Sequence, residues 1–394
     1  MTADPGPLDG VLVADLSRVL AGPLATSMLA DLGATVVKVE RPGRGDDTRN
    51  WGPPWTKSSS SYFQSANRSK RSIALDFEDV DDVQLARTLC HRADVVVENY
   101  RPGALDRFGL GYEQVQALNP GVVYCSVSGF GSGVGASRPG YDFVVQAVGG
   151  LMSITGAPDG EPTKVGVALV DVLTGKDAVI GILAGLAARR RDGLGQHVEV
   201  NLLSSLLGAL VNQASGYLAT GSSPTRMGNR HPSIAPYESL RCSDGLLAVA
   251  CGNDGQFARL CYVLGCSELA TDQRFSTNPA RVQNRDVLAH ALESRLATGT
   301  AETWERSLLE VGVPAGRVRD VEGALELATS LGLDPLHPVH GHLPQLRHPV
   351  RYSRSAVRPP EPPPDLGQHD DEVRSWLRSP DEFPLDDLAR KAFR

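Results

Sequence analysis

One carboxylate stands out because it interrupts an apolar stretch. Asp171 lies within GVALVDVLTGKDAVIGILAGL, residues 166–186, where the pattern predicts a long helix that begins near Val172. Burying an aspartate is costly unless something satisfies its charge, so Asp171 either caps this helix or takes part in chemistry. At the helix start, backbone N–H groups and the helix dipole would favour the ionised carboxylate. Such a sheltered carboxylate could attack an acyl group, and a plain N-cap is the alternative.

A second group of candidates consists of basic residues near glycines or loop ends. Taken singly, each is expected to be a solvated surface side chain, whereas together they could receive phosphate groups. The group comprises Arg41, Arg71, Arg101, Arg107 and Arg138. Sequence spacing alone does not bring these side chains together.

Histidines near the C-terminus raise the question of a metal site. His337, His340 and His342 have the spacing H-x-x-H-x-H, and His348 follows them. Only Asp334 stands nearby as a further ligand, and the segment is rich in Pro and Gly. We therefore expect no metal site here.

The elements that must position these residues follow the pattern of a layered α/β fold. Residues 10–16 and 34–40 are predicted as buried strands, with a helix between them that ends at Gly33. This β-α-β start favours a parallel sheet. Further strands are expected at 72–77, 93–99 and 122–130. The turn DLSRVLAGPLA after the first strand lacks GxGxxG, which argues against a dinucleotide-binding enzyme.

The second half of the chain indicates another domain. We predict a long apolar helix at 198–220, and a strand at 246–252. The expected division is a large domain over 1–220, a Gly- and Pro-rich linker or active-site loop at 221–238, a small domain over 239–325, and a Pro-rich return strap that completes the large domain over 326–394.

Composition limits the functional classes. The chain has 394 residues and a net charge of −7, with Lys and Arg scattered along it, so nucleic-acid binding is not expected. It has no uninterrupted apolar stretch of about 18 residues and no signal-peptide pattern at its start, so neither a membrane span nor export is expected. Its six cysteines form no CxxC pair, which fits reduced thiols in a cytoplasmic protein.

Many blocks of the sequence, in the same order, resemble family III CoA-transferases, the CaiB/BaiF family. They include LDGVLVADLSRVLAGPLATSMLADLGATVVKVERPGRGDDTRNWGPP, NRSKRSIALD, ADVVVENYRPGALDRFGLGY, RPGYDFVVQAVGGLMSITG, GNRHPSIAPYE and DLGQHDDEV. The resemblance spans nearly the whole chain. It implies a Rossmann-like large α/β domain formed by both chain ends, a smaller inserted α/β domain, and a homodimer of interlocked subunits.

The resemblance also gives Asp171 a role, because the family's catalytic aspartate precedes a similar T/SG-containing helix. It implies a CoA-transferase that moves CoA from an acyl-CoA donor to a carboxylic acid acceptor. Asp171 would form mixed anhydrides and an aspartyl-CoA thioester on the way. Coenzyme A and acyl-CoA are then substrates, and no permanently bound cofactor and no metal are needed.

Matched positions imply where the substrates bind. For coenzyme A they are Arg41, Leu75, Asp76, Asn99, Tyr100, Arg101, Arg107 and Arg138. For the acid substrate the candidates are Leu20, Gly228, Asn229 and His231. Leu20 stands where formyl-CoA transferase has a glutamine, which argues against oxalate-type substrates.

Two alternatives to transfer remain at this stage. α-Methylacyl-CoA racemases of the same family use a histidine in a GHD context, and this chain has Gly140-Tyr141-Asp142 there. Tyrosine has an ordinary pKa of about 10 and is a poor acid or base at neutral pH, so transfer is favoured over racemisation at the α-carbon. A non-catalytic CoA-binding protein would require Asp171 to be only a helix cap.

Overall fold

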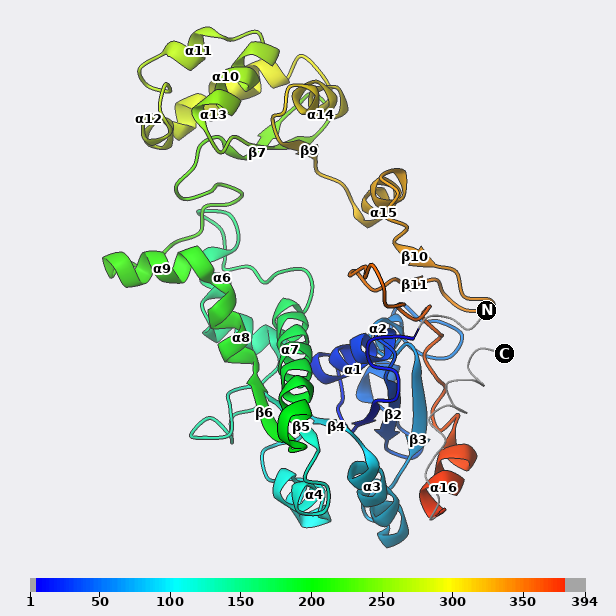
Figure 1. The fold of residues 1–394 in the computed structure, drawn as a ribbon. Helices are drawn as coiled ribbons and strands as arrows, with labels where there is room; N and C mark the ends of the chain where they lie inside the picture. Colours follow the sequence, from blue (N-terminus) through cyan, green and yellow to red (C-terminus); the bar gives the residue numbers. More distant parts are fainter. Residues whose placement is uncertain (1–4, 380–394) are drawn as a thin grey trace. The chain divides into compact units, whose positions relative to one another are not determined.

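A computed structural model describes residues 5–379 of the chain. Its main sheet has six parallel strands in the order β3-β2-β1-β4-β5-β6 (Figure 1). The strands are β1 (Leu12–Asp15), β2 (Thr35–Glu40), β3 (Lys70–Ala74), β4 (Val95–Glu98), β5 (Val123–Ser128) and β6 (Gln196–Asn201). The five strands predicted from sequence are confirmed to within a few residues, and the parallel α/β prediction is confirmed with them.

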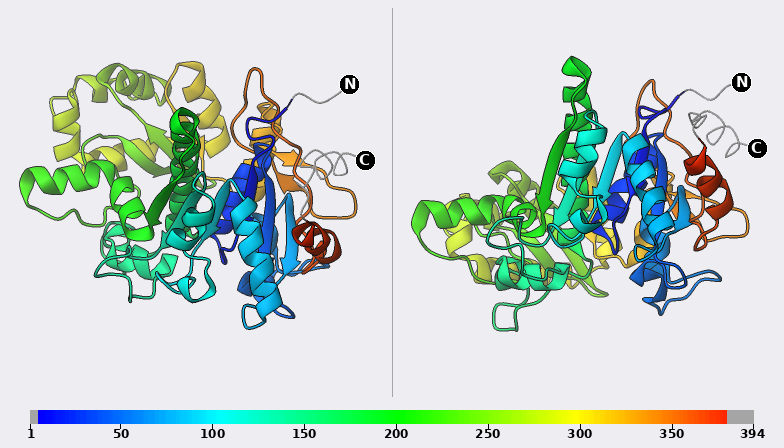
Figure 2. Two further views of the ribbon diagram at one scale, coloured as in Figure 1. Left: turned by 60° about the horizontal axis from the view of Figure 1, so that its bottom comes forward. Right: turned by 90° about the horizontal axis from the view of Figure 1, so that it is seen from below.

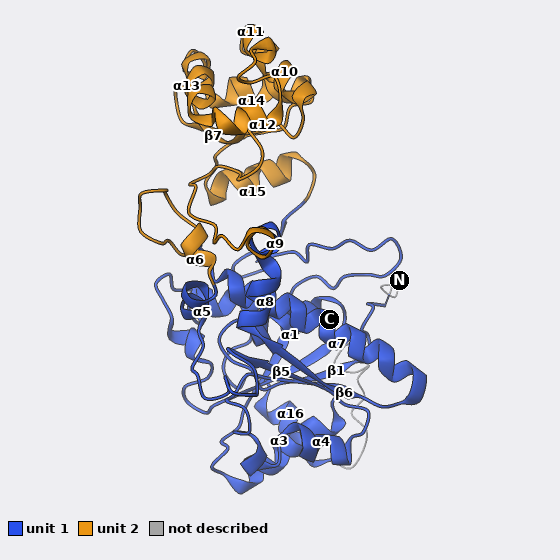
Figure 3. Cartoon of the chain, turned by 90° about the vertical axis from the view of Figure 1, so that its left-hand side faces the viewer, with its two compact units in different colours: residues 1–149, 165–215, 334–394 blue, residues 150–164, 216–333 orange. Residues whose placement is uncertain are grey.

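Helices cover both faces of this sheet (Figure 3). One face carries α1 (Ala21–Asp31) and α7 (Leu169–Asp192), which pack against each other. The other carries α3 (Val80–Arg92), α4 (Tyr112–Leu118) and α16 (Asp370–Arg378). Strands buried on both sides read as continuous apolar runs such as Val95–Val97, which is why the sequence located them well.

The helix predicted at 198–220 is partly wrong. Its first residues form β6, and the helical part divides into α8 (Leu202–Ala209) and α9 (Val211–Thr220). The hydrophobic periodicity changes within this segment. Residues 196–201, QHVEVN, alternate as a strand does, and the helical period begins only after them. Asn201 marks the boundary, because its side chain accepts a hydrogen bond from the Ser204 N–H and caps α8.

The end of the chain returns to the large sheet. The Arg358 N–H donates to the Asp31 carbonyl at 2.9 Å, and the His369 N–H donates to the Ser72 carbonyl at 3.0 Å. A short hairpin, β10 (Leu336–His337) and β11 (Gln345–Leu346), precedes this return. Helix α16 then lies beside β3, as Figure 2 also shows.

The chain divides into two compact units (Figure 3). Unit 1 comprises residues 1–149, 165–215 and 334–394, and unit 2 comprises 150–164 and 216–333. Unit 2 contains an antiparallel sheet of β7 (Tyr237–Arg241), β8 (Leu246–Ala250) and β9 (Ala315–Arg317). Its helices are α6 (Leu151–Ile154), α10 (Asp254–Val263), α11 (Glu268–Thr271), α12 (Asn278–Gln283), α13 (Arg285–Leu296), α14 (Ala301–Glu310) and α15 (Val321–Ser330).

Short helices connect the longer elements of unit 1. They are η1 (Asp47–Asn50), α2 (Ser61–Ala66), η2 (Asp106–Phe108) and α5 (Asp142–Val148). Within residues 5–379, no helix is long and apolar enough to cross a membrane.

Candidate active site

Asp171 lines a cavity of about 310 Å³ at the carboxyl ends of the parallel strands. Loops after β1, β4 and β5 form its walls together with the first turn of α7. This edge of an open α/β sheet is where ligands bind in such folds. Six of the predicted site residues line this cavity: Leu20, Asn99, Tyr100, Arg101, Arg138 and Asp171.

The start of α7 differs from the sequence prediction. The helix begins at Leu169, so Asp171 lies inside its first turn and is not the N-cap. Asp142, the first residue of α5, does the capping instead: its Oδ1 accepts from the Val170 N–H at 2.7 Å and the Asp171 N–H at 3.3 Å. Gln146 Nε2 donates to the other oxygen of Asp142 at 2.6 Å and fixes its orientation. A residue 29 positions away along the chain therefore satisfies this helix end.

The carboxyl group of Asp171 is consequently free for a ligand. The side chain is nearly buried, with 8% of the residue exposed, and no group in residues 5–379 donates a hydrogen bond to its oxygens. Burial, and then the charge of Asp142, raise its pKa to about 7. The expectation that helix N–H groups keep Asp171 ionised is wrong, because Asp142 already uses those groups and adds a negative charge.

Close packing of α1 on α7 sets the position of Asp171. A Cβ on Gly175 would lie 2.8 Å from the Ala21 carbonyl oxygen, a distance that side chains do not tolerate. The Thr174 hydroxyl turns back to the Val170 carbonyl at 2.7 Å and does not obstruct the contact. The T-G pair thus brings the second turn of α7 against Ala21 at the start of α1, and Asp171 lies one turn earlier on the same helix.

The loop after β1 carries backbone strain that buried charges hold in place. Val19 has a φ of 72°, which is rare for a β-branched residue. Its N–H donates to both carboxylate oxygens of Asp46, at 3.2 and 3.3 Å. Lys38 Nζ lies 3.0 Å from Asp46, and both side chains are fully buried. The strained turn therefore depends on an ion pair between β2 and the loop that follows it.

A second buried pair, Asp15 and Lys70, supports the same region at 2.9 Å. Burial by itself raises the pKa of Asp15, but Lys70 and Lys38 outweigh it and bring the pKa down to about 2. The sequence analysis missed both pairs. The only signal was a charged residue inside each of several otherwise apolar strands, such as Lys38 in TVVKVE.

Asn99 joins the loops after β1 and β4. Its Oδ1 accepts from the Arg18 N–H at 2.9 Å, and its Nδ2 donates to the Arg18 carbonyl at 2.6 Å. Because both polar atoms of its amide already bond to the backbone, Asn99 positions the cavity wall. The next residue, Tyr100, is held by its N–H, which donates to Glu98 Oε2 at 2.8 Å.

A second cavity, of about 250 Å³, adjoins the first and shares two lining residues, Arg18 and Tyr100. Its walls contain four more of the predicted residues: Arg41, Leu75, Asp76 and Arg107. Phe77 and Phe108 also line this cavity, with ring centroids 5.3 Å apart, and Phe77 stacks on Tyr100. All eight residues predicted to contact CoA thus line two neighbouring cavities of unit 1. Arg18 and Phe77 were missed by the sequence analysis.

The sequence profile described as CoA-transferase family III matches residues 8–370 of the chain. This protein belongs to CoA-transferase family III. The enzyme is 43% identical to the succinate–glutarate CoA-transferase of Agrobacterium fabrum, over 95% of this chain and 96% of that protein. It is 44% identical to the acetyl-CoA:oxalate CoA-transferase of Acetobacter aceti, over 82% of this chain and 83% of that protein.

A solved structure gives the same answer. The crystal structure of a CaiB/BaiF family protein from Brucella suis is similar with a TM-score of 0.87 and 46% sequence identity. The match covers 95% of this enzyme and 100% of that chain. The predicted membership of this family is therefore confirmed, and so is the prediction that the chain is a CoA-transferase.

The remaining predicted substrate residues of the transferase lie in unit 2: Gly228, Asn229 and His231. Asn229 Nδ2 donates to Ser239 Oγ at 2.6 Å, and the His231 ring lies 5.1 Å from that of Tyr237. Asn229 also lines a groove of about 550 Å³ over β7, β8 and β9. Their role in binding the acid substrate stays a prediction.

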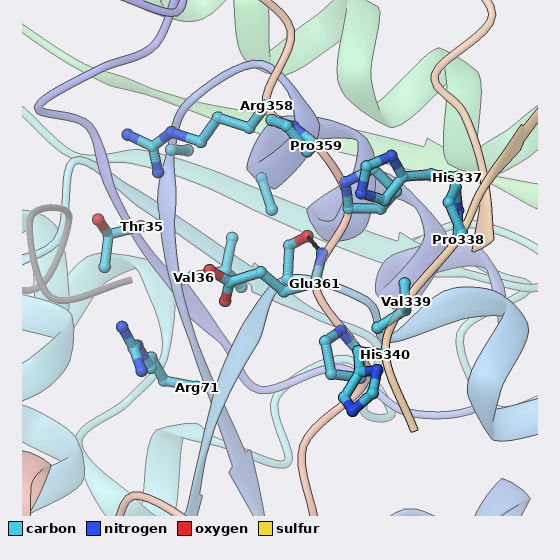
Figure 4. A pocket seen from close by; sticks show the side chains of 15 residues that line it. Thr35, Val36, Arg71, His337, Pro338, Val339, His340, Arg358, Pro359 and Glu361 are labelled. Atoms are coloured by element: carbon cyan, nitrogen blue, oxygen red, sulfur yellow. Dashed lines mark hydrogen bonds between the residues drawn. The ribbon is translucent and has the colours of Figure 1, made fainter. Parts of the chain in front are cut away.

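Another cavity of unit 1, of about 320 Å³, is lined by Arg71, one of the basic candidates, but by none of the residues that the family resemblance assigns to CoA or the acid (Figure 4). It lies by the first residues of β2 and β3, and the returning chain contributes His337, His340, Arg358 and Glu361. His348 is elsewhere, with Nδ1 3.2 Å from Asp31. Across residues 5–379, no group of three or more His, Cys, Asp or Glu side chains could hold a metal ion.

Proposed function

We propose that this enzyme moves CoA from an acyl-CoA donor to a carboxylic acid acceptor through covalent intermediates on Asp171. The supporting observation is the uncommitted carboxyl group of Asp171, which lines a cavity continuous with an arginine-lined one through shared residues. The family and the names of its relatives support the transfer reaction. The chemical route is our proposal.

In the first half-reaction, an Asp171 carboxylate oxygen attacks the thioester carbonyl carbon of the donor. The C–S bond breaks, CoA leaves as the thiolate, and a mixed anhydride joins Asp171 to the acyl group. The thiolate then attacks the Asp171 carbonyl carbon of that anhydride. The donor acid leaves as its carboxylate, and Asp171 is left as an aspartyl-CoA thioester.

In the second half-reaction, the acceptor carboxylate attacks the aspartyl thioester and releases the CoA thiolate again. A second anhydride forms, and the thiolate attacks its acceptor-derived carbonyl carbon. The product acyl-CoA leaves and the Asp171 carboxylate is restored. The thioester bond energy is conserved at each step, so no metal, redox group or permanently bound cofactor is required in this scheme.

The two cavities suggest how CoA lies. The adenosine end would occupy the cavity with Arg41, Leu75, Asp76 and Arg107, where the Phe77 and Phe108 rings offer stacking surfaces. The pantetheine arm would then pass Tyr100 and enter the cavity with Arg101, Arg138 and Asp171. Arginine side chains at both ends suit phosphate and carboxylate groups.

We propose small dicarboxylates as the acids exchanged. The Agrobacterium fabrum relative is named for succinate and glutarate, while the Acetobacter aceti relative is named for acetyl-CoA and oxalate. Leu20 adds an apolar side chain to the cavity that Asp171 lines, which disfavours the two adjacent carboxylates of oxalate. Gly228, Asn229 and His231 are proposed to contribute to acceptor binding.

We also propose a cytoplasmic homodimer of interlocked subunits, with unit 2 as the inserted smaller domain. Support comes from large apolar side chains exposed on the helices after Asp171, where Ile180 and Val211 are each 65% exposed and Leu207 is 50% exposed. Such a surface is costly in a monomer and is typical of an interface.

Trapping of the covalent intermediate tests this function. The protein is incubated with succinyl-, glutaryl-, acetyl- and oxalyl-CoA, treated with hydroxylamine, digested and analysed by mass spectrometry, beside an Asp171→Asn control. We expect a hydroxamate on the Asp171 peptide with succinyl- and glutaryl-CoA, little or none with oxalyl-CoA, and none with any donor in the control. Absence of label with every donor, together with exchange of the substrate α-proton, would replace transfer by racemisation.

A further inference from the structure

Arg18 occupies the junction of the two cavities. It lies in the loop after β1 and, with Tyr100, lines both the Asp171 cavity and the cavity that contains Arg41. Its backbone is fixed on both sides of the residue, because its N–H and carbonyl both bond to the Asn99 amide. A basic side chain is thus presented from a rigid support to the space that connects the two cavities.

The guanidinium of Arg18 is fixed in position, but no carboxylate of the described residues forms a close hydrogen-bonded ion pair with it. Its central carbon lies 4.8 Å from the centre of the Tyr100 ring, which holds the group by a cation–π contact. The nearest carboxylate oxygen, from Asp47, is 3.8 Å from Nη1, and Asp47 bonds to Arg41 at 2.7 Å. Nε of Arg18 is buried and has no hydrogen-bond partner within residues 5–379.

A buried, unpaired N–H donor of this kind is costly unless a ligand satisfies it. In CoA, the diphosphate is the group that links the adenosine to the pantetheine arm. If adenosine lies in the Arg41 cavity and the thioester at Asp171, the diphosphate must pass the point where the cavities meet. That point is lined by Arg18, whose fork of N–H donors matches phosphate oxygens.

We propose that Arg18 binds the diphosphate of CoA and so sets how far the pantetheine arm reaches toward Asp171. This inference rests on the proposed function, because it needs CoA to lie across both cavities. The Val19–Leu20 turn follows Arg18 directly, so a diphosphate held at Arg18 also steadies the wall of the Asp171 cavity. Arg18 thereby couples binding of the CoA diphosphate to the position of the thioester at Asp171.

Three thioesters of succinate distinguish binding of the diphosphate by Arg18 from an effect of Arg18 on the reaction itself. Succinyl-CoA has both the diphosphate and the 3′-phosphate, succinyl-3′-dephospho-CoA keeps only the diphosphate, and succinyl-pantetheine has neither. For Arg18→Gln we expect kcat/KM to fall about 10- to 100-fold with the first two, since an Arg–phosphate hydrogen bond is lost. With succinyl-pantetheine the change should stay within about threefold, since that substrate offers Arg18 nothing to bind.

Arg44→Gln is the matched control, because Arg44 is an exposed arginine between β2 and η1 that lines neither cavity. It should leave kcat/KM for all three thioesters within about twofold of the unmodified enzyme. Arg18→Lys keeps the charge without the fork and should give an intermediate loss with the two diphosphate substrates.

The outcomes separate the inference from the proposed function. An equal loss of kcat/KM for all three thioesters would overturn a diphosphate role. So would a loss that disappears when butyryl-CoA replaces succinyl-CoA, since Arg18 would then bind the distal carboxylate of the acyl group. If the unmodified enzyme used no CoA thioester at all and Asp171 took no label, the proposed function itself would fail.

Discussion

At the scale of single residues, the decisive feature is a carboxyl group placed beside another carboxylate and away from water. Burial and Asp142 raise the pKa of Asp171 to about 7. In the proposed mechanism Asp171 must be ionised to attack. Its environment lowers the fraction that is ionised near pH 7, but it makes the ionised form more reactive because water solvates it poorly. Asp142 contributes to this raised pKa because its negative charge repels that of Asp171, and the same side chain caps α7.

The pKa of Asp171 predicts a pH dependence for the proposed first half-reaction. Asp171 is protonated well below pH 7 and ionised above it, so the rate of acyl transfer to Asp171 should rise with pH through about 7 and then level off. The measurement is single-turnover formation of the hydroxylamine-sensitive adduct between pH 5.5 and 8.5. A flat profile over that range would contradict the raised pKa.

The same shift predicts an unusual stability effect for Asp171→Asn. The folded-state pKa lies above the unfolded-state value of about 4, so the stability it contributes is fully present below pH 4 and is lost as pH rises through 7. At pH 8 the ionised carboxylate therefore opposes folding, and Asn should stabilise the protein by about 1–4 kcal/mol. Urea unfolding at pH 8 and at pH 4 measures this. Equal effects at both pH values would refute it.

Asp142 offers a test of the two roles that it combines. Asp142→Asn keeps an oxygen acceptor for the Val170 N–H but removes the charge, so the midpoint of the pH–rate profile should move to lower pH. Asp142→Ala also removes the cap and should cost about 1 kcal/mol of stability in addition. The two profiles and two unfolding curves are compared directly. Identical behaviour of the variants would mean that the cap contributes nothing.

At the scale of elements, sequence periodicity located the buried strands, because their pattern depends only on neighbouring residues in the chain. The strands β1, β2, β4 and β5 were predicted because short, mostly apolar stretches mark strands covered on both faces. The start of α7 was misplaced because its cap comes from Asp142, far away in sequence. The Asp15–Lys70 pair, between β1 and β3, was missed because pairing across strands leaves no periodic trace. The Lys38–Asp46 pair was missed because Asp46 lies in the loop after β2, outside any periodic element.

The contact between α1 and α7 gives a prediction for Gly175. In Gly175→Ala, the new methyl group would meet the Ala21 carbonyl oxygen at 2.8 Å and push the two helices apart. We expect a loss of about 1–3 kcal/mol in stability, together with reduced kcat, because Asp171 lies one turn away on the same helix. Thermal unfolding and steady-state kinetics provide the two readouts.

Gly208→Ala is the control for that substitution. Gly208 lies within α8 and has open space where a Cβ would be added. Alanine is the better helix former, so stability should be unchanged or slightly raised. If both variants lose stability equally, the loss reflects helix glycines in general and not the contact between α1 and α7.

At the scale of the whole molecule, the chain crosses repeatedly between its two units, so neither is a continuous segment. All residues predicted to contact CoA lie in unit 1, while three of the four acid-site candidates lie in unit 2. Residue spacing could not supply these candidates, which came from the family resemblance, and the structure divides them between the two units. If these assignments hold, CoA binding depends on unit 1, while the choice of acid depends on Leu20 of unit 1 together with residues of unit 2.

The proposed interlocked dimer makes a topological prediction about subunit exchange. Two rings that pass through each other cannot separate unless one chain opens, so dissociation requires unfolding and not only loss of an interface. Two preparations with different affinity tags are mixed, incubated for days and analysed by tandem purification. We expect no mixed dimers until the mixture is unfolded in denaturant and refolded together, after which about half should be mixed by random pairing. Exchange in native buffer would show that the subunits merely dock, and a monomeric mass at micromolar concentration would remove the dimer altogether. Only the monomeric result would leave the exposed side chains of Ile180, Leu207 and Val211 requiring another explanation, because docked subunits could still cover them.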